Sequence, residues 1–73
     1  MKNIIKDLLN NFRGTFEIYK TKKKEYAWRL KASNNQIIAT SGESYVGKSY
    51  CKEAVKKVRA YSLFAKVVEV DGK

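Results

Sequence analysis

Residues 42–49 carry the spacing in this chain that is best suited to phosphate chemistry. Gly42, Gly47, Lys48 and Ser49 satisfy the pattern G-x-x-x-x-G-K-[ST], which forms a loop between a strand and a helix in nucleotide-binding proteins. Backbone N–H groups of such a loop surround the phosphates at the start of the helix, and the lysine reaches the terminal phosphate. The flanking residues predict a strand before this stretch and a helix after it, so the local context fits.

The wider topology argues against nucleotide hydrolysis. The motif needs neighbouring parallel β-α units, whereas the preceding strand belongs to a predicted antiparallel meander, and 73 residues leave no room for parallel neighbours. A lysine and free amides at a helix start are sufficient to bind an anion without catalysis. We therefore expect at most passive anion binding here, by Gly47, Lys48 and Ser49.

The net charge indicates a different class of ligand. Sixteen Lys and Arg residues against seven Asp and Glu residues give +9, a charge that attracts nucleic acid or acidic protein. The lysines are spread along the whole chain, which is equally typical of a solvated surface. A nucleic-acid-binding module would contact phosphates through one flank of the helix and the outer face of the sheet. Its candidate residues are Tyr19, Arg29, Lys31, Lys48, Lys52, Lys56 and Arg59.

The sequence offers little to an enzyme. It contains no histidine, and its single cysteine, Cys51, excludes an internal disulfide and an ordinary zinc site. A catalytic cysteine would also need a base to form its thiolate, and no histidine can supply one. We predict a non-enzymatic protein without a metal or a cofactor. We also expect it to be cytoplasmic, because no window approaches the roughly 20 apolar residues of a membrane span and the N-terminus lacks signal-peptide features.

Alternating apolar residues predict a β-hairpin at residues 15–33. In the predicted strands, residues 15–20 and 25–33, a loop centred on residues 22–24 pairs Ile18 with Trp28 and sets Glu17 opposite Arg29. A shift of one residue would divide the apolar side chains between two faces, so we expect this register to be well determined.

A second turn is predicted to continue the meander. Asn34 and Asn35 suit a two-residue hairpin turn because asparagine tolerates a positive φ. Such a turn pairs Leu30 with Ala39 and Ala32 with Ile37, so a third strand at residues 36–40 would extend the same apolar face.

The rest of the chain predicts two helices and a fourth strand. Residues 48–62 form a helix with one apolar stripe, in which Cys51 is a buried core thiol, and residues 65–70 read as a strand. Residues 1–13 place apolar side chains at helical spacing and predict a short amphipathic helix ending at Gly14. We expect this helix to dock on the sheet or on a second chain; a membrane-surface helix is the alternative.

Several runs of residues resemble the YegP-like family of small bacterial proteins. The resemblance covers residues 16–59 and keeps the family spacing throughout. It consists of Phe16-Glu-Ile-Tyr-Lys20, Trp28-Arg-Leu-Lys-Ala32, Ile37-Ile-Ala-Thr-Ser-Gly-Glu43, Tyr45, Lys48 and Cys51. Lys24 and Asn35 stand where the family has glycine in its two turns, so we expect both turns to be less comfortable here.

The resemblance implies an α+β fold with a β-β-β-α-β unit at residues 14–73, preceded by the helix at residues 1–13. It also implies that this unit is completed by a second unit, with strands intertwined in a shared sheet, so a single-unit chain is expected to be a homodimer. Size points the same way, because a domain of 73 residues without disulfides usually needs a partner. The family's unknown activity leaves two functions open: a homodimeric interaction module and a nucleic-acid-binding module.

Overall fold

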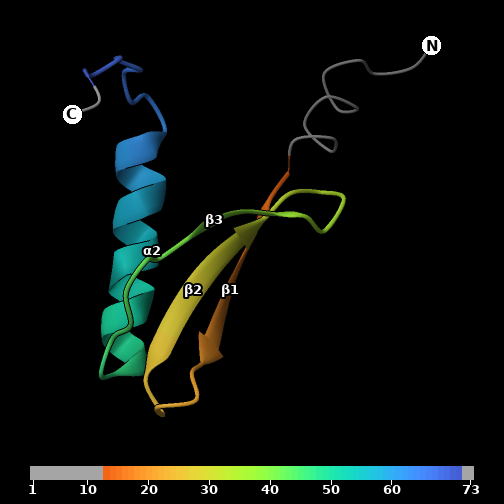
Figure 1. Ribbon diagram of the computed structural model, residues 1–73, viewed down its shortest axis with the longest axis vertical. Coiled ribbons are helices and arrows are strands. Elements are labelled where there is room, and N and C mark those ends of the chain that lie inside the picture. Colours follow the sequence, from red (N-terminus) through yellow and green to blue (C-terminus); the bar gives the residue numbers. More distant parts are fainter. Residues whose placement is uncertain (1–12, 72–73) are drawn as a thin grey trace.

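The computed structural model describes residues 13–71 and contains three strands followed by one helix (Figure 1). The elements are β1 (Thr15–Lys20), β2 (Tyr26–Lys31), β3 (Ile37–Thr40) and α2 (Lys48–Ser62). The strands form one antiparallel sheet in the order β1-β2-β3, as the predicted meander requires. The helix predicted at residues 1–13 lies outside the described residues.

The first hairpin has the predicted register. Ile18 lies opposite Trp28, Phe16 opposite Leu30 and Glu17 opposite Arg29. Opposite residues in an antiparallel pair share a face, so Phe16 and Trp28 meet on the inward face. Their rings pack edge to face, with centroids 5.4 Å apart and an interplanar angle of 72°. The alternation of apolar and polar side chains therefore predicted the register of this hairpin correctly.

The outer face of the same hairpin is polar and internally paired. The Nε–H of Arg29 donates to the Glu17 carboxylate at 2.7 Å, and the Lys31 ammonium lies 3.4 Å from the other carboxylate oxygen. The Arg29 guanidinium also lies over the Tyr19 ring, 4.7 Å from its centroid. The Glu17 carboxylate thus pairs with two cations on this face, and one of these cations also covers the Tyr19 ring.

Both hairpin turns are built in the same way. The Lys24 N–H donates to the Thr21 carbonyl and the Asn35 N–H donates to the Ala32 carbonyl, so each turn has two central residues before the donor. Lys24 has a φ of 67° and Asn35 a φ of 71°, the left-handed conformation that favours glycine. Strain at these two positions, where the family has glycine, was expected from the resemblance.

The predicted two-residue turn at residues 34–35 is wrong in detail. Asn34 does not have a positive φ, and the N–H of Ala32 donates to the Gln36 carbonyl, so the loop contains three residues and only Asn35 is left-handed. Three-residue hairpin loops commonly combine a turn with one left-handed residue. Asparagine suits either loop, which is why its presence could not distinguish them.

The longer loop changes the pairing of β3. Leu30 lies opposite Ala39 as predicted, but Ile37 lies opposite Lys31 and not opposite Ala32. The register shifts between Leu30 and Lys31, which leaves Ile38 as an extra residue on β3. Ile37 therefore shares the outer face with Lys31, and both Ile37 and Ile38 are exposed.

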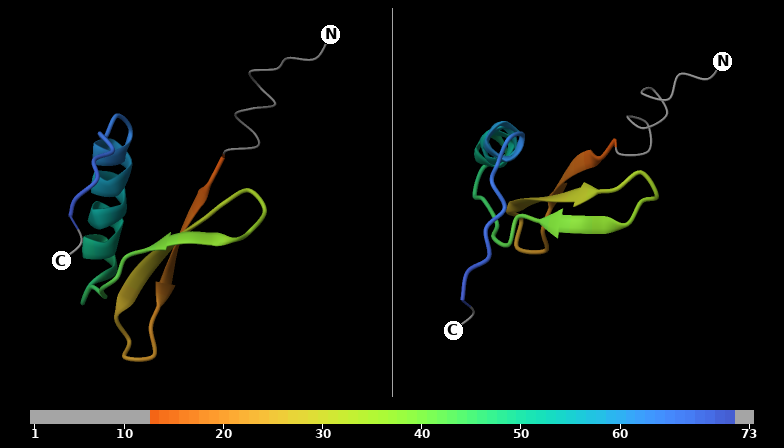
Figure 2. Two further views of the ribbon diagram at one scale, coloured as in Figure 1. Left: turned by 45° about the horizontal axis from the view of Figure 1, so that its top comes forward. Right: turned by 90° about the horizontal axis from the view of Figure 1, so that it is seen from above.

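Helix α2 lies on one side of the sheet, against β2 and β1 (Figure 2). Its bounds are those predicted, and Cys51 is its buried residue, with no exposed surface. Within residues 13–71, the only other buried residues are Ala27 and Trp28. The core of the described chain is therefore small, and Cys51 is a core thiol as predicted.

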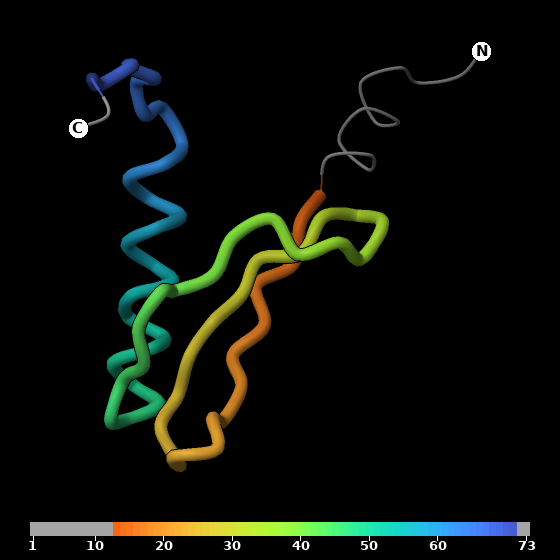
Figure 3. Tube along the Cα trace, viewed as in Figure 1, coloured from red at the N-terminus to blue at the C-terminus, as the bar shows by residue number. Residues whose placement is uncertain are grey.

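The fourth strand predicted at residues 65–70 is not formed in this single chain. The residues after α2 have no regular secondary structure, and the trace in Figure 3 leaves the end of the helix without joining the three strands. A strand needs a neighbour for its backbone hydrogen bonds, and the described chain brings none to this segment.

Candidate functional site

The loop that joins β3 to α2 is the part of the molecule where the phosphate-binding pattern was found. Gly42 has a φ of 72°, so this position needs glycine to turn the chain after β3. The Ser41 hydroxyl donates to the Glu43 carbonyl at 2.6 Å, and the Ser41 N–H donates to the Trp28 carbonyl. The loop is therefore tied to β2 and to itself.

The amide of Tyr45 is used by the sheet and is not directed toward a ligand. Tyr45 and Tyr26 exchange both backbone hydrogen bonds, at 2.7 and 2.8 Å, in an isolated antiparallel bridge. A phosphate loop needs its N–H groups to converge on one point. Together with the antiparallel β2-β3 pairing, this bridge argues against the nucleotide-binding arrangement that the pattern suggested.

The start of α2 also keeps free amides within the described chain. Gly47 is the N-cap and has no side chain to satisfy the first N–H groups, and the first turn contains no acidic residue. Lys48 and Ser49 are exposed beside these amides. A Cβ at Gly47 would lie 3.1 Å from the Tyr50 ring, so close packing accounts for this glycine without a ligand.

The seven candidate nucleic-acid-binding residues lie on two separate surfaces. Tyr19, Arg29 and Lys31 are on the outer face of the sheet, on which Glu17 partly neutralises the two cations. The other four residues follow one flank of α2, which packs on the opposite, inward face. These residues are Lys48, Lys52, Lys56 and Arg59.

The helix flank is the less neutralised of the two surfaces. Lys56 lies 3.8 Å from Glu53, and both side chains are well exposed. Within residues 13–71, no carboxylate lies within 4 Å of Lys48, Lys52 or Arg59. A phosphate backbone could therefore approach this flank, but one chain does not combine it with the sheet face.

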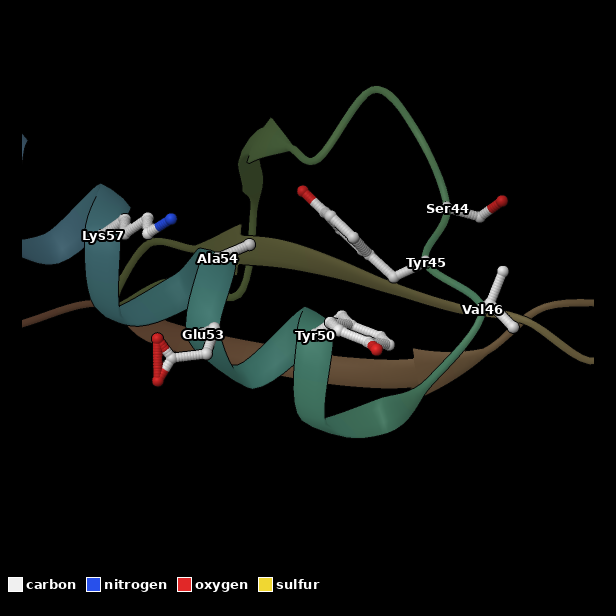
Figure 4. A pocket seen from close by; sticks show the side chains of 7 residues that line it. All are labelled: Ser44, Tyr45, Val46, Tyr50, Glu53, Ala54 and Lys57. Atoms are coloured by element: carbon white, nitrogen blue, oxygen red, sulfur yellow. The ribbon is translucent and has the colours of Figure 1, made fainter.

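A groove beside α2 was missed by sequence reasoning. It has a volume of about 540 Å³ and lies between the end of the loop and the first turns of the helix (Figure 4). From the helix it takes residues at positions i, i+3, i+4 and i+7, a stripe next to the inward one. The lining residues are Ser44, Tyr45, Val46, Tyr50, Glu53, Ala54 and Lys57.

The groove is apolar at its centre and charged at its rim. Tyr45 and Tyr50 line it from the loop and the helix, and Ala54, Glu53 and Lys57 line it further along the helix (Figure 4). Tyr50 is 67% exposed, which is high for an aromatic residue in a cavity wall. The helical stripe could have been noticed in the sequence, but the loop that faces it comes close only through the bridge to Tyr26.

Tyr45 connects the groove to the core. Burial raises the pKa of the Tyr45 phenol, and the nearby Glu43 carboxylate, to which the hydroxyl donates at 3.4 Å, acts in the same direction. The Trp28 indole lies close enough to oppose this shift, although its Nε1–H has no hydrogen-bond partner in the described chain. Burial also raises the pKa of the Cys51 thiol, which makes it a weak nucleophile.

The described part of the chain has neither a cluster of metal-ligating side chains nor a helix that could span a membrane. No group of three or more His, Cys, Asp or Glu side chains is placed to hold a metal ion among residues 13–71. Over the same range, no helix has the length and apolar character needed to cross a bilayer. The groove, the helix start and the helix flank are thus the features to explain.

An antiparallel three-stranded meander with one helix on its face defines a small α+β protein. Residues 17–69 match the family model described as "Domain of unknown function (DUF1508)". The chain belongs to this family, which is the one that the sequence resemblance indicated.

Relatives in two bacteria share about half of the aligned residues with this chain. The chain is 49% identical over 55 residues to a UPF0339 protein of Neisseria meningitidis serogroup B, an alignment that covers 75% of this chain and 96% of that protein. It is 46% identical over 57 residues to a UPF0339 protein of Treponema denticola, covering 78% and 97% of the two chains. These relatives consist almost entirely of the matched unit.

Two structures determined by NMR in solution have the same fold. A protein from Haloferax volcanii aligns with a TM-score of 0.72 and 32% identity, covering 81% of this chain and 98% of that one. Protein ATU0232 from Agrobacterium tumefaciens aligns with a TM-score of 0.62 and 33% identity, covering 78% and 90%. The same architecture therefore occurs in both proteins.

Proposed function

We propose that this protein is a non-enzymatic interaction module that works as a homodimer, in which residues 63–70 of each copy complete the fold of the other. The observation that carries the proposal is the exposure of apolar side chains along this segment. Phe64 is 91% exposed and Val67 is 95% exposed. The exposed apolar residues of the segment are Leu63, Phe64, Val67, Val68 and Val70.

The composition of this segment favours a strand with a partner. Three of its last four apolar residues are valines, and β-branched residues fit the half-buried surface of a sheet. Burying a Val, Leu or Phe side chain is worth about 1.5–3 kcal/mol relative to leaving it in water. A single chain gains little of this stabilisation from residues 63–70, because their apolar side chains are at least 70% exposed.

The small core supports the same proposal. Among residues 13–71, Ala27, Trp28 and Cys51 are the only buried ones. Domains of this size rarely reach adequate stability from one hydrophobic core and are often stabilised by disulfides, a metal or a partner subunit. One cysteine cannot form an internal disulfide, so a partner subunit is the favoured source of stability.

The sheet also has edges that can accept a strand. β1 and β3 each pair with β2 on one side only, which leaves backbone N–H and C=O groups on the other side. An extended segment that joins such an edge gains main-chain hydrogen bonds, and alternate side chains reach the face of the sheet. Residues 63–70 of a second copy have the length and pattern for this role.

One relative is long enough to hold two such units. A UPF0339 protein of Photorhabdus laumondii is 37% identical over 57 residues, which is 78% of this chain but 49% of that protein. About half of that protein therefore lies outside the matched unit. A second unit in the same chain would supply covalently what a homodimer supplies by association.

The test is the mass of the protein in solution. We expect light scattering to give twice the chain mass of 8.4 kDa, and Val67→Asp to return the protein to the single-chain mass, because a charge cannot enter an apolar interface without a partner. Lys22→Asp, which places the same carboxylate in the exposed first turn, should remain dimeric. A wild-type protein that is monomeric at all accessible concentrations contradicts the proposal.

Nucleic-acid binding along the flank of α2 is a second candidate function. The absence of ion pairs at Lys48, Lys52 and Arg59 within the described chain favours it, and a dimer would carry +18 from two chains of +9. Titration of labelled DNA and RNA at several salt concentrations is the measurement, because phosphate contacts weaken as salt rises. No binding at low salt, or binding unchanged by Lys52→Glu, rejects this function and leaves the dimer intact.

A further inference from the structure

The groove beside α2 has the features of an acceptor for an extended chain segment. Its loop wall is strand-like, because Tyr45 directs both of its backbone hydrogen-bonding groups to Tyr26. In an antiparallel pattern, the groups of the residues on either side point away from that partner. Within the described chain, the backbone groups of Ser44 and Val46 have no hydrogen bonds.

The side chains around the loop at residues 44–46 are arranged to contact an apolar ligand. Val46 is 80% exposed on the loop, and Tyr50 presents its ring from the helix (Figure 4). The groove volume of about 540 Å³ is larger than one aromatic or two aliphatic side chains require. Tyrosine walls of this kind give a large contact area with little loss of side-chain freedom.

We propose that this groove is the binding site for residues 64–70 of a second copy of the chain. The segment lies extended along residues 44–46, and its apolar side chains enter between Tyr45 and Tyr50. This inference rests on the proposed homodimer and adds to it the acceptor surface, which the dimer alone does not specify. The groove of each copy is incomplete until the other copy supplies these side chains.

Charge complementarity supports this occupant and gives it a direction. The rim carries Glu53 and Lys57, one turn apart on α2, and the segment carries Lys66 and Glu69. Val67 and Glu69 share one face of an extended segment, whereas Lys66 lies on the other face. With Val67 in the groove and the segment running in the same direction as α2, Glu69 lies toward Lys57. The reverse direction places Glu69 toward Glu53, which carries a like charge.

The edge of β1 is the competing acceptor, and its surroundings fit the segment less well. Its C-terminal end leads into a turn with lysines at positions 22–24, which adds only positive charge. The outward side chains of β1 are already engaged, since Glu17 pairs with Arg29 and Tyr19 lies under the same guanidinium.

Cross-linking between mixed chains tests the acceptor directly. One batch carries Ala54→Cys in the groove and the other carries Val67→Cys in the segment, and the two are mixed, allowed to exchange and treated with a short bismaleimide. We expect a covalent heterodimer that forms at least tenfold faster than with wild-type chains. Cys51 is fully buried, so the wild-type protein is the control for background labelling. Tyr19→Cys mixed with Val67→Cys tests the edge of β1, and circular dichroism verifies that each variant is folded.

The outcomes of these experiments distinguish a failure of the groove proposal from a failure of the homodimer proposal. Cross-linking from Ala54→Cys and not from Tyr19→Cys supports the groove. Cross-linking from Tyr19→Cys alone, or dimers of twice the chain mass with neither cross-link, overturns the groove and leaves the homodimer standing. A monomeric wild-type protein overturns both proposals. Lys57→Glu provides a second readout: it should weaken association at least tenfold, and Glu69→Lys in the other chain should restore it.

Discussion

Glu17 is the residue whose ionisation is most directly coupled to the fold. The hydrogen bond from Arg29 holds the pKa of the Glu17 carboxyl below its ordinary value of 4.5, and Lys31 adds to the effect. A lowered pKa in the folded chain means that the carboxylate stabilises the fold above pH 4.5 and that this contribution disappears as the pH falls through the folded-state value.

We therefore expect Glu17→Gln to destabilise the protein at pH 7 and to differ less from the wild type near pH 2, because the Glu17 carboxylate becomes protonated as the pH falls below its lowered pKa. Urea unfolding at each pH measures the difference. The contribution should also shrink in high salt, because the pair is partly exposed. A difference in unfolding free energy that is the same at both pH values would contradict this role.

Lys24 has a left-handed backbone conformation, which is unfavourable for a residue with a side chain. A φ of 67° costs an ordinary L-residue about 1–2 kcal/mol, whereas the additional freedom of glycine in the unfolded chain costs about 0.4–1 kcal/mol. We expect Lys24→Gly to raise the free energy of unfolding by about 0.5–1 kcal/mol in urea titrations. Lys23→Gly, in the same turn but without a positive φ, should lower it. Equal effects at the two positions would show that backbone strain is not the cause.

At the scale of elements, α2 is attached to the sheet through one buried side chain. Cys51 has no exposed surface, and burial raises its pKa, so it should react with a disulfide reagent only when the helix leaves the sheet. Labelling should be slow in the native protein and should accelerate in urea well below the unfolding midpoint. Lys52→Cys adds an exposed thiol one residue later, outside the groove, so one equivalent should react quickly and the second slowly. Fast labelling of wild-type Cys51 would contradict this docking.

The elements also show which parts of the structure the sequence could predict. The register of β1 and β2 and the bounds of α2 follow from local periodicity, because a one-residue shift would expose Phe16 or Trp28. The length of the loop before β3 could not be predicted from the sequence, since asparagine suits both hairpin geometries. The groove could not be predicted from the sequence either. Its wall at Tyr45 depends on a bridge to Tyr26, nineteen positions earlier, and no local sequence pattern indicates that bridge.

At the scale of the whole molecule, the proposed dimer would make stability depend on two chains, because apolar residues after α2 are exposed in one chain. If residues 63–70 are buried only in a dimer, unfolding releases two chains and the midpoint temperature must depend on protein concentration. A tenfold increase in concentration changes the free energy of a dimer by about 1.4 kcal/mol, which corresponds to about 3–5 °C for an assembly of this size.

Differential scanning fluorimetry over a hundredfold range of concentration measures this dependence. The wild type and Lys22→Asp should show it, because neither loses the apolar segment. Val67→Asp should melt at a lower temperature that is independent of concentration, since its 8.4 kDa chain unfolds alone. A wild-type midpoint temperature that stays constant over the whole range would mean that the three-stranded sheet and α2 are stable without a partner. The exposed valines of residues 67–70 would then not be buried by a second copy of the chain.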